Sequence, residues 1–321
     1  MAIAYLCLKK PKDQPQQFLK LTHRPHFFKK SVFLFLSAGI LIIFQLIDSF
    51  FVFNSLVDSG VPALEAMKLK GSFDRGLPIV QTATVFTSAI VSSTIPQMAG
   101  LTDIKKRKKV FNFALFLVLL LSIPACVGLF SVVDELNIAL FKDNSGVEAL
   151  KILTIQILFY PFIFLSTAVM QQEGQYSRLM MSVLAGILVK IGLTAPLTME
   201  MGISGAAISS VAALGIMAVI NLFQFKKMIY RQSILTLIKV LFSTLGLWMT
   251  LDYLGPQIPT ILSGMDDVRM YNVISLAIQV MAGVTVYGLI MGIFLMTTKV
   301  AGKGAKRRKK KAKNVKSIAK V

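Results

Sequence analysis

The chain has 321 residues, of which 55% are hydrophobic and 16% charged, and its mean hydropathy is +0.69. A soluble globular domain is about one quarter charged, so this composition excludes a water-soluble protein and predicts a membrane protein. The two cysteines, Cys7 and Cys126, lie far apart in the sequence, which argues against a disulfide-stabilised secreted scaffold.

Residues 1–30 form a basic segment before the first apolar run. The first eight residues are apolar in character, but KKPKDQ follows them where a small-residue cleavage site would be needed, so we expect no cleavable signal peptide. The motif HRPHFF holds both histidines, His23 and His26, without a cysteine or carboxylate partner. Two histidines alone make a poor metal site, so we expect no metal and no cofactor.

Eight apolar runs follow, each long enough to cross the roughly 30 Å hydrocarbon core of a bilayer as a helix. They cover residues 31–53, 77–99, 110–133, 149–170, 179–197, 203–225, 234–252 and 271–298. The sequence therefore predicts an all-α polytopic membrane domain over residues 31–298, followed by a basic tail at 299–321.

The fifth and sixth runs are separated by TMEMG alone, which predicts a tight helical hairpin. Small residues follow this connection, and small residues let membrane helices approach closely. They are Gly202, Gly205, Ala206, Ala207, Ser209 and Ser210. We interpret this group as a packing surface.

The connections between the runs alternate in charge. Basic residues dominate before the first run and after the second, fourth, sixth and eighth, whereas the other connections hold most of the acidic residues. Because Lys and Arg are enriched in cytosolic loops, this alternation predicts a multi-pass protein of the cytoplasmic membrane with both termini in the cytosol.

The tail from Lys299 is strongly basic but contains no aromatic side chain that would stack on nucleic-acid bases. Each Lys or Arg near an anionic leaflet contributes about 1 kcal/mol of attraction. We therefore expect a disordered arm that binds anionic inner-leaflet lipids, and no nucleic-acid partner.

The sequence lacks the short motifs of common enzymes and metal sites, including GxxxxGKS/T, HExxH, GxSxG, paired CxxC and DxD. The acidic pair Asp266 and Asp267 falls in a connection that the charge pattern places outside the cell. No cytosolic connection is long enough to form a catalytic domain. We therefore do not expect an enzyme, and the polar groups at membrane depth favour a transporter, channel or assembly scaffold.

Two ionisable residues fall deep inside apolar runs, Asp48 in the first and Lys190 in the fifth. Charges at such depth are costly, so each should face the bundle interior and have a partner. Measured from the cytosolic ends of their runs at 1.5 Å per residue, Asp48 lies about 25 Å deep and Lys190 about 16 Å deep. This difference argues against a direct pair but leaves one open, together with a proton relay through Asp48.

Three segments resemble the later half of a polysaccharide-biosynthesis flippase of the MOP exporter superfamily. They are FQLIDSFFVFNSLVDSG at 44–60, KGSFDRGLPIVQTATVFTSAIVSSTIPQMAG at 70–100, and residues 170–227 with MQQEGQYSR and GISGAA. The similarity is to the Gram-positive lipid II flippase branch, the MurJ-like and stage V sporulation protein B-like membrane proteins.

This resemblance implies a fold of fourteen helices in two lobes, in which the eight runs correspond to helices seven to fourteen. The chain would then supply one lobe plus two extra helices, and a separate N-terminal lobe would be its partner. The implied substrate is a lipid-linked sugar pyrophosphate, moved by alternating access between the two lobes. The last two runs would shelter its lipid tail.

The resemblance also implies a substrate site. An Asp-Arg pair lines the cavity in lipid II flippases, and Asp74 with Arg75 matches it; Pro78 stands where several relatives carry an acidic residue one turn later. The planar guanidinium of Arg75 suits phosphate oxygens. Alternatively, Asp74 caps a helix that begins near Gly76 while Arg75 meets outer headgroup phosphates.

Some family members resemble sodium-coupled carriers, with a carboxylate on helix seven and polar ligands on helix eleven. Asp48 lies on the helix that matches the seventh, and Lys190 supplies a cation on the one that matches the eleventh. If the two pair, the lysine would take the place of the ion, so we expect no sodium coupling.

The sequence therefore predicts the C-terminal portion of a lipid-linked oligosaccharide flippase, with lipid II or a related polysaccharide precursor as substrate. Two alternatives stay open: a fragment of a drug or organic-cation antiporter, and a non-transporting membrane scaffold or remnant. An adjacent reading frame that encodes six apolar spans would favour a split flippase over a scaffold.

Overall fold

The structure, a computed structural model, describes residues 25–99, 101, 103–258 and 267–318. Side chains at 25–30, 90, 99, 231–235 and 297–318 are not described, so the predictions for His23, His26, Cys7 and the tail side chains lie outside the described residues. The described chain is helical and holds no strand. Its elements are α2 (Pro25–Ala38), α3 (Ile40–Asp58), α4 (Ala63–Ala99), α5 (Ile104–Phe141), α6 (Val147–Thr154), α7 (Gln156–Gln172), α8 (Tyr176–Met201), α9 (Ile203–Phe225), α10 (Arg231–Leu254), η1 (Gly255–Gln257) and α12 (Val268–Ile318).

Within the described residues, eight helical segments are long and apolar enough to cross a membrane, which confirms the predicted all-α polytopic fold. The fourth segment combines α6 and α7, which meet at Ile155, and the seventh combines most of α10 with η1. The α8–α9 hairpin turns at Gly202 as the sequence predicted.

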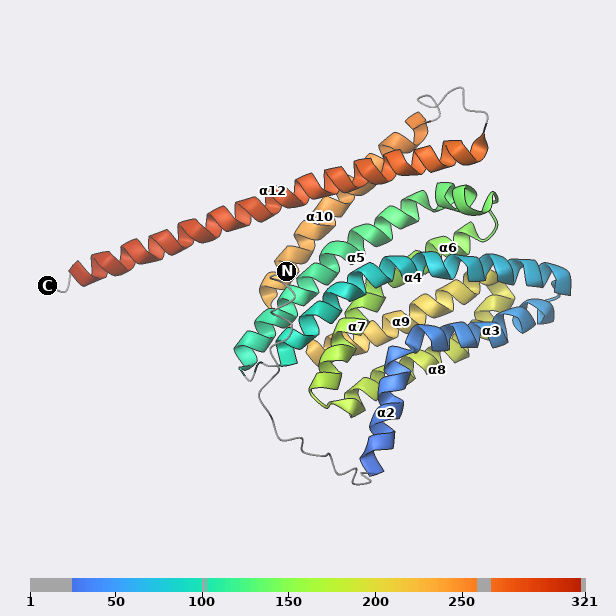
Figure 1. The fold of residues 1–321 in the computed structure, drawn as a ribbon, viewed down its shortest axis with the longest axis horizontal. Coiled ribbons are helices and arrows are strands. Elements are labelled where there is room, and N and C mark those ends of the chain that lie inside the picture. Colours follow the sequence, from blue (N-terminus) through green and yellow to red (C-terminus); the bar gives the residue numbers. More distant parts are fainter. Residues whose placement is uncertain (1–24, 100, 102, 259–266, 319–321) are drawn as a thin grey trace, which may run out of the picture.

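The first predicted run is not one straight helix. The chain breaks at Gly39, and α2 and α3 run in different directions (Figure 1). Helix α3 then extends to Asp58, five residues beyond the predicted end of the run, because no breaker precedes Gly60, whose φ is +93°.

Helix α4 begins at Ala63, well before the predicted run at 77. Charged residues ended the hydropathy signal but not the helix, since Lys70 and Asp74 form an i,i+4 ion pair on its surface. The alternative in which Asp74 caps a helix near Gly76 is therefore wrong, because Asp74 lies inside α4.

The expectation of a disordered tail is also wrong for the described backbone, because α12 continues to Ile318. The tail is rich in Lys, Arg and Ala, which are favourable helix formers. In Figure 1 this part of α12 reaches beyond the rest of the molecule.

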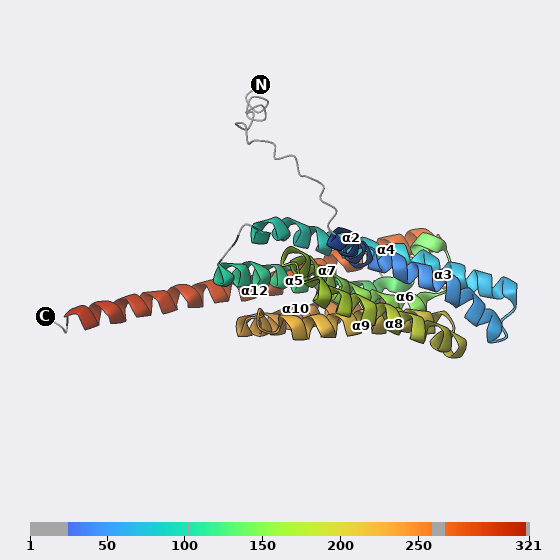
Figure 2. The same ribbon diagram turned by 90° about the horizontal axis from the view of Figure 1, so that it is seen from below.

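Helices α3 to α9 form one bundle, and α10 and α12 pack on α5 and on each other (Figure 1). Figure 2 shows α4 on one face and α9 with α10 on the opposite face, with α5 and α7 between them. This arrangement agrees with the prediction of one lobe plus two extra helices.

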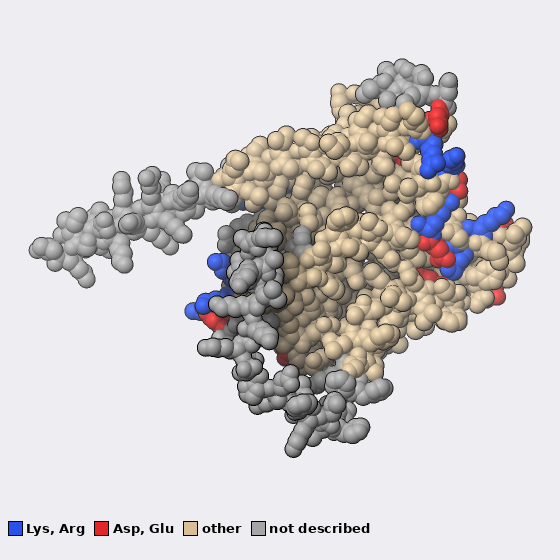
Figure 3. Space-filling view, viewed as in Figure 1, with Lys and Arg blue, Asp and Glu red and all other residues tan. Residues whose placement is uncertain are grey.

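Charged side chains gather at two opposite edges of the molecule, with a wide band free of visible charge between them (Figure 3). The membrane-length helices expose large apolar residues along their middle parts, such as Phe50, Phe86 and Leu188. Such a belt matches a bilayer, where apolar side chains face lipid rather than water.

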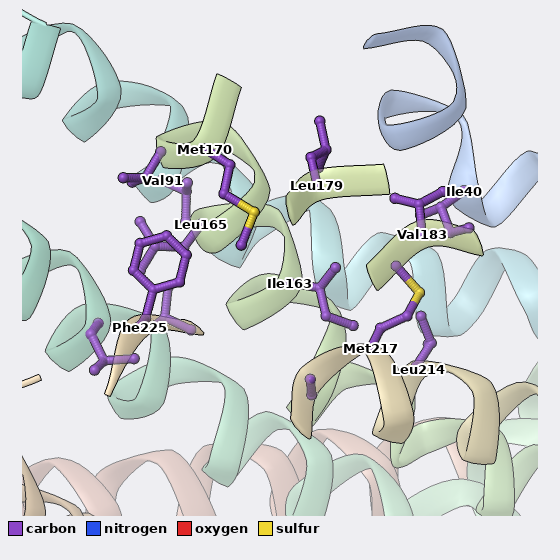
Figure 4. Close-up of a cluster of buried hydrophobic side chains, with 14 of the residues drawn as sticks. Ile40, Val91, Ile163, Leu165, Met170, Leu179, Val183, Leu214, Met217 and Phe225 are labelled. Carbon is purple, nitrogen blue, oxygen red and sulfur yellow. The ribbon is translucent and has the colours of Figure 1, made fainter. Parts of the chain in front are cut away.

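The bundle interior contains two apolar clusters, one toward each edge. The first cluster joins the start of α3, the end of α4, the end of α7 and the start of α8 (Figure 4). The second joins the end of α3, the start of α4, α6 and the start of α9. In the sequences of α3, α4 and α9, buried polar residues lie between the members of the two clusters; they include Asp48, Thr84, Thr87 and Ser210. Lys190 on α8 is also buried.

Candidate functional site

An ion pair occupies the middle of the bundle. Asp48 on α3 is 2% exposed and Lys190 on α8 is fully buried. The Lys190 Nζ donates hydrogen bonds to the carboxylate of Asp48, to Ser210 Oγ at 2.6 Å and to Ser209 Oγ at 3.0 Å. The carbonyl of Ala206 lies 3.3 Å away. The ammonium group therefore lies among four oxygen atoms from α3 and α9.

The structure shows why the depths calculated along the apolar runs argued against a direct Asp48–Lys190 pair. Residues before Gly39 belong to α2, which takes another direction, so Asp48 lies only about 12 Å along α3. Lys190 lies about 21 Å along α8, but its long side chain leans back toward the N-terminus of that helix. The two groups meet at an intermediate depth.

Ser209 and Ser210 serve this pair as well as packing. Their hydroxyls take hydrogen bonds from Lys190, and Thr194 Oγ1 lies 3.1 Å from Ser209 Oγ. The sequence interpretation assigned the two serines to helix packing alone. Their spacing of 19 and 20 residues from Lys190, across a tight hairpin, was the signal that placed them opposite it.

Arg75 lies near the opposite end of α4 from the basic loops and contacts the turn between α5 and α6. Its Nη1 donates to Asp143 Oδ2 at 2.9 Å, and its Nη2 donates to Asp143 Oδ1 and to both the carbonyl and the hydroxyl of Ser145 at 2.8 Å. The guanidinium carbon lies 4.4 Å from the centre of the Phe141 ring. We call Arg75, Asp143 and Ser145 the Arg75 latch.

The latch uses the same donor geometry that would bind a phosphate. Hydrogen bonds from Arg75 and Ser145 hold the pKa of the Asp143 carboxyl well below its usual range. Asp74 does not join the latch, because it pairs with Lys70 on another side of α4. The structure therefore does not bring Asp74 and Arg75 together, and neither contacts the Asp48–Lys190 pair.

A groove with polar side chains lies between α2, α3, α4 and α7. Its volume is about 450 Å³, and it combines apolar walls with amide and hydroxyl side chains. We call it the α3–α4 groove; its polar members are Gln45, Gln81, Thr84, Ser88, Ser92 and Tyr160. Gln45 precedes Asp48 by three residues on α3, so the groove and the pair share one depth.

The groove was not predicted from the sequence, although a signal existed. Gln81, Ser88 and Ser92 recur at spacings of seven and four residues, which places them on one face of α4. Among the described residues, no hydrogen bond is made by the side-chain amides of Gln45 and Gln81. These amides are available to a ligand or to a facing protein surface.

Comparisons with known proteins point to one fold. No protein-family profile matches the chain. A membrane protein of Bacillus subtilis, described as uncharacterized membrane protein YabM, is 32% identical over 200 residues, which are 61% of this chain and 37% of that protein.

Two solved structures are similar. The lipid II flippase MurJ, in an inward closed conformation, superposes with a TM-score of 0.61 and 16% identity, and the match covers 88% of this chain and 57% of MurJ. An outward-facing multidrug resistance MATE transporter of the MOP superfamily gives a TM-score of 0.51 and 16% identity over 81% of this chain and 63% of that one. The chain thus spans less than two thirds of each relative.

These likenesses confirm the predicted resemblance at the level of fold. The chain is a multi-pass membrane protein with the fold of MOP-superfamily transporters, and its structural neighbours are transporters.

Proposed function

We propose that this chain forms one lobe, with two additional helices, of an alternating-access transporter that moves a lipid-linked oligosaccharide across the cytoplasmic membrane. The α3–α4 groove carries the proposal, because at bilayer depth it holds two side-chain amides, Gln45 and Gln81, that form no hydrogen bond among the described residues, beside several hydroxyl groups. Polar groups in that position face a water-filled cavity or another protein surface rather than lipid. The likeness to the lipid II flippase MurJ supports a glycolipid as the substrate class.

The chemistry of the groove favours a sugar over an organic cation. Its lining side chains carry no carboxylate, and the nearby carboxylate of Asp48 is bound to Lys190. Amides and hydroxyls match the hydroxyl groups of a sugar, since each can donate and accept hydrogen bonds. A cation antiporter would need a free negative charge that this groove does not supply.

Arg75 is our candidate for the pyrophosphate. In the described structure the guanidinium group of Arg75 is bound to Asp143, so phosphate binding requires that the phosphate replace the Asp143 carboxylate. Guanidinium groups bind carboxylate and phosphate with the same paired geometry. We propose that Arg75 alternates between the latch and the substrate, while Asp74 stays with Lys70 and shapes the local charge.

The proposal requires a second lobe that faces the α3–α4 groove, because a central cavity needs two walls. It also gives the ion pair a role. The Lys190 ammonium already fills an oxygen-lined position, so we propose that transport proceeds without sodium coupling. Replacing Na⁺ by K⁺ at constant ionic strength should then leave transport unchanged.

Genetic complementation tests the function. The resident lipid II flippase is depleted in a Gram-positive host that expresses this chain alone, or together with a six-helix lobe. Rescue is expected from the paired form, and it should be lost with Arg75→Ala or Gln81→Leu. Gln97→Leu is the matched control, since it makes the same change on an exposed position of α4 outside the groove.

Membrane abundance must be equal in every strain. Failure of all forms despite correct insertion would remove the cell-wall-precursor substrate for this chain. Rescue that survives both Arg75→Ala and Gln81→Leu would remove these two residues from the substrate path.

A further inference from the structure

A second groove opens at the membrane surface where α8 begins and α9 ends. It has a volume of about 500 Å³, and three cationic side chains line it: Arg178, Lys226 and Lys227. We call it the α8–α9 basic groove. It lies on the surface that the charge bias predicts to be cytosolic, away from the α3–α4 groove and the Arg75 latch.

The groove has an uncompensated positive charge. None of its lining side chains is acidic, and among the described residues none of the three cations forms an ion pair. Glu173, in the turn before α8, is bound to Arg107 and Gln175. Arg178 donates from Nη1 to Gln175 Oε1 at 2.9 Å and keeps other donors for a ligand.

The apolar wall of the groove lies next to these cations, on the side toward the middle of the helices. On α8, Met181 follows Arg178 by three residues, a rise of about 4.5 Å. Phe223 lies in the last turn of α9, and Lys227 follows it by four residues in the turn after that helix. An apolar side chain therefore lies deeper than a cation on both sides of the groove. Met181 is 55% exposed and Phe223 is 68% exposed.

A buried acceptor completes the groove. The Gln224 Nε2 donates to the carbonyl of Arg178 at 3.3 Å, while its Oε1 is buried and has no hydrogen-bond partner among the described residues. A buried carbonyl without a donor is costly. A hydroxyl group on a bound molecule would satisfy it.

We propose that the α8–α9 basic groove is a binding site for an anionic glycerophospholipid of that leaflet, held with its phosphate at the three cations and its acyl chains against Met181 and Phe223. A phosphoglycerol headgroup fits best, because it offers a hydroxyl to Gln224. Basic pockets between membrane helices bind anionic headgroups in this way. The site is independent of the transport proposal.

Quenching by brominated lipids tests the site. The full chain, with Trp248→Phe and Phe223→Trp, carries one tryptophan in the groove and is reconstituted in vesicles of phosphatidylcholine and phosphatidylglycerol, with either lipid brominated. Preference for phosphatidylglycerol at this tryptophan should be at least about fivefold. It should fall to near one when Arg178, Lys226 and Lys227 are each replaced by Gln.

The control replaces Lys105, Lys106 and Lys109 by Gln, which removes the same charge from exposed positions at the start of α5. This variant should keep the preference. Equal quenching by both lipids in the reporter protein that keeps all three groove cations would overturn the proposal. An equal loss of the preference in the two triple variants would also overturn it, because the effect would then come from general surface charge. So would loss of the preference on addition of free glycerol phosphate, because the site would then bind the headgroup without its acyl chains.

Discussion

The Lys190 ammonium and the Asp48 carboxylate stabilise the bundle only as a pair, because each would otherwise be an uncompensated charge among apolar side chains. Both are buried, and the apolar clusters on either side keep water from them. Removing one partner of a buried ion pair costs about 3–5 kcal/mol, whereas replacing both by uncharged groups is often nearly neutral.

We therefore expect Lys190→Met and Asp48→Asn each to destabilise the protein by about 3–5 kcal/mol, and the double variant to recover most of that loss. The double-mutant cycle, measured by unfolding in detergent, gives the coupling energy directly. If the double variant is as unstable as the sum of the two single variants, the pair does not stabilise the fold.

At the scale of single residues, the sequence identified the two intramembrane charges and left open whether they pair. Asp48 and Lys190 stand out because a charge inside an apolar run is rare. Their pairing depends on the break at Gly39, which hydropathy does not reveal. Likewise Arg75 was identified from its motif, whereas Asp143 lies 68 residues away on a turn and became its partner only through the fold.

The α8–α9 hairpin depends on a glycine at one close contact between backbones. A Cβ atom added to Gly205 would lie 1.9 Å from the carbonyl oxygen of Leu197, and backbone atoms do not yield easily. At Gly192 on α8, an added Cβ would meet nothing within 4 Å. Both glycines lie in helices, but only Gly205 has a neighbouring backbone within contact distance of an added Cβ atom.

Gly205→Ala is expected to destabilise the protein by about 1–3 kcal/mol or more, because overpacking forces the helices apart. Gly192→Ala is the matched control and should be neutral, or stabilising by up to about 1 kcal/mol, since Ala favours a helix. Thermal unfolding of both variants in the same detergent provides the measurement. Equal stability of the two variants would contradict the close contact at Gly205.

The Arg75 latch gives an element-scale prediction about pH. The pKa of Asp143 is lowered in the folded protein by hydrogen bonds from Arg75 and Ser145. Its contribution to stability is therefore complete above the unfolded value, about 3.9, and is lost as pH falls through the lower folded value. Thermal unfolding between pH 5 and 8 should show no difference in pH dependence between the native chain and Asp143→Asn. A difference that develops in this range would contradict the assignment.

Element boundaries were predictable only where hydropathy and helix breaks coincide. The hairpin at Gly202 satisfies both conditions, since apolar runs end there and the backbone adopts a φ of +62°. At the start of α4, charged residues end the apolar run while the helix continues through an i,i+4 pair. Hydropathy therefore measures how much of a helix meets lipid and leaves its total length undetermined.

At the scale of the whole molecule, the apolar runs predicted the number of crossings and the alternation of charged loops predicted their direction, both without reference to any relative. Eight candidate spans in the described residues agree with that number. The α3–α4 groove escaped prediction because residues from four helices line it, and the sequence alone does not show which faces of these helices meet.

The orientation of the molecule can be tested by labelling at its two charged edges. Asn144, in the turn after α5, and Lys106, at the start of α5, are exposed and lie at opposite ends of that helix. In a background with Cys7→Ser and Cys126→Ser, we expect Asn144→Cys to react with a membrane-impermeant maleimide in intact cells. Lys106→Cys should react only after permeabilisation, because Lys- and Arg-rich loops stay in the cytosol. The opposite pattern would invert the topology and would place the α8–α9 basic groove on the outer surface, whereas labelling of both sites in intact cells would contradict a single orientation.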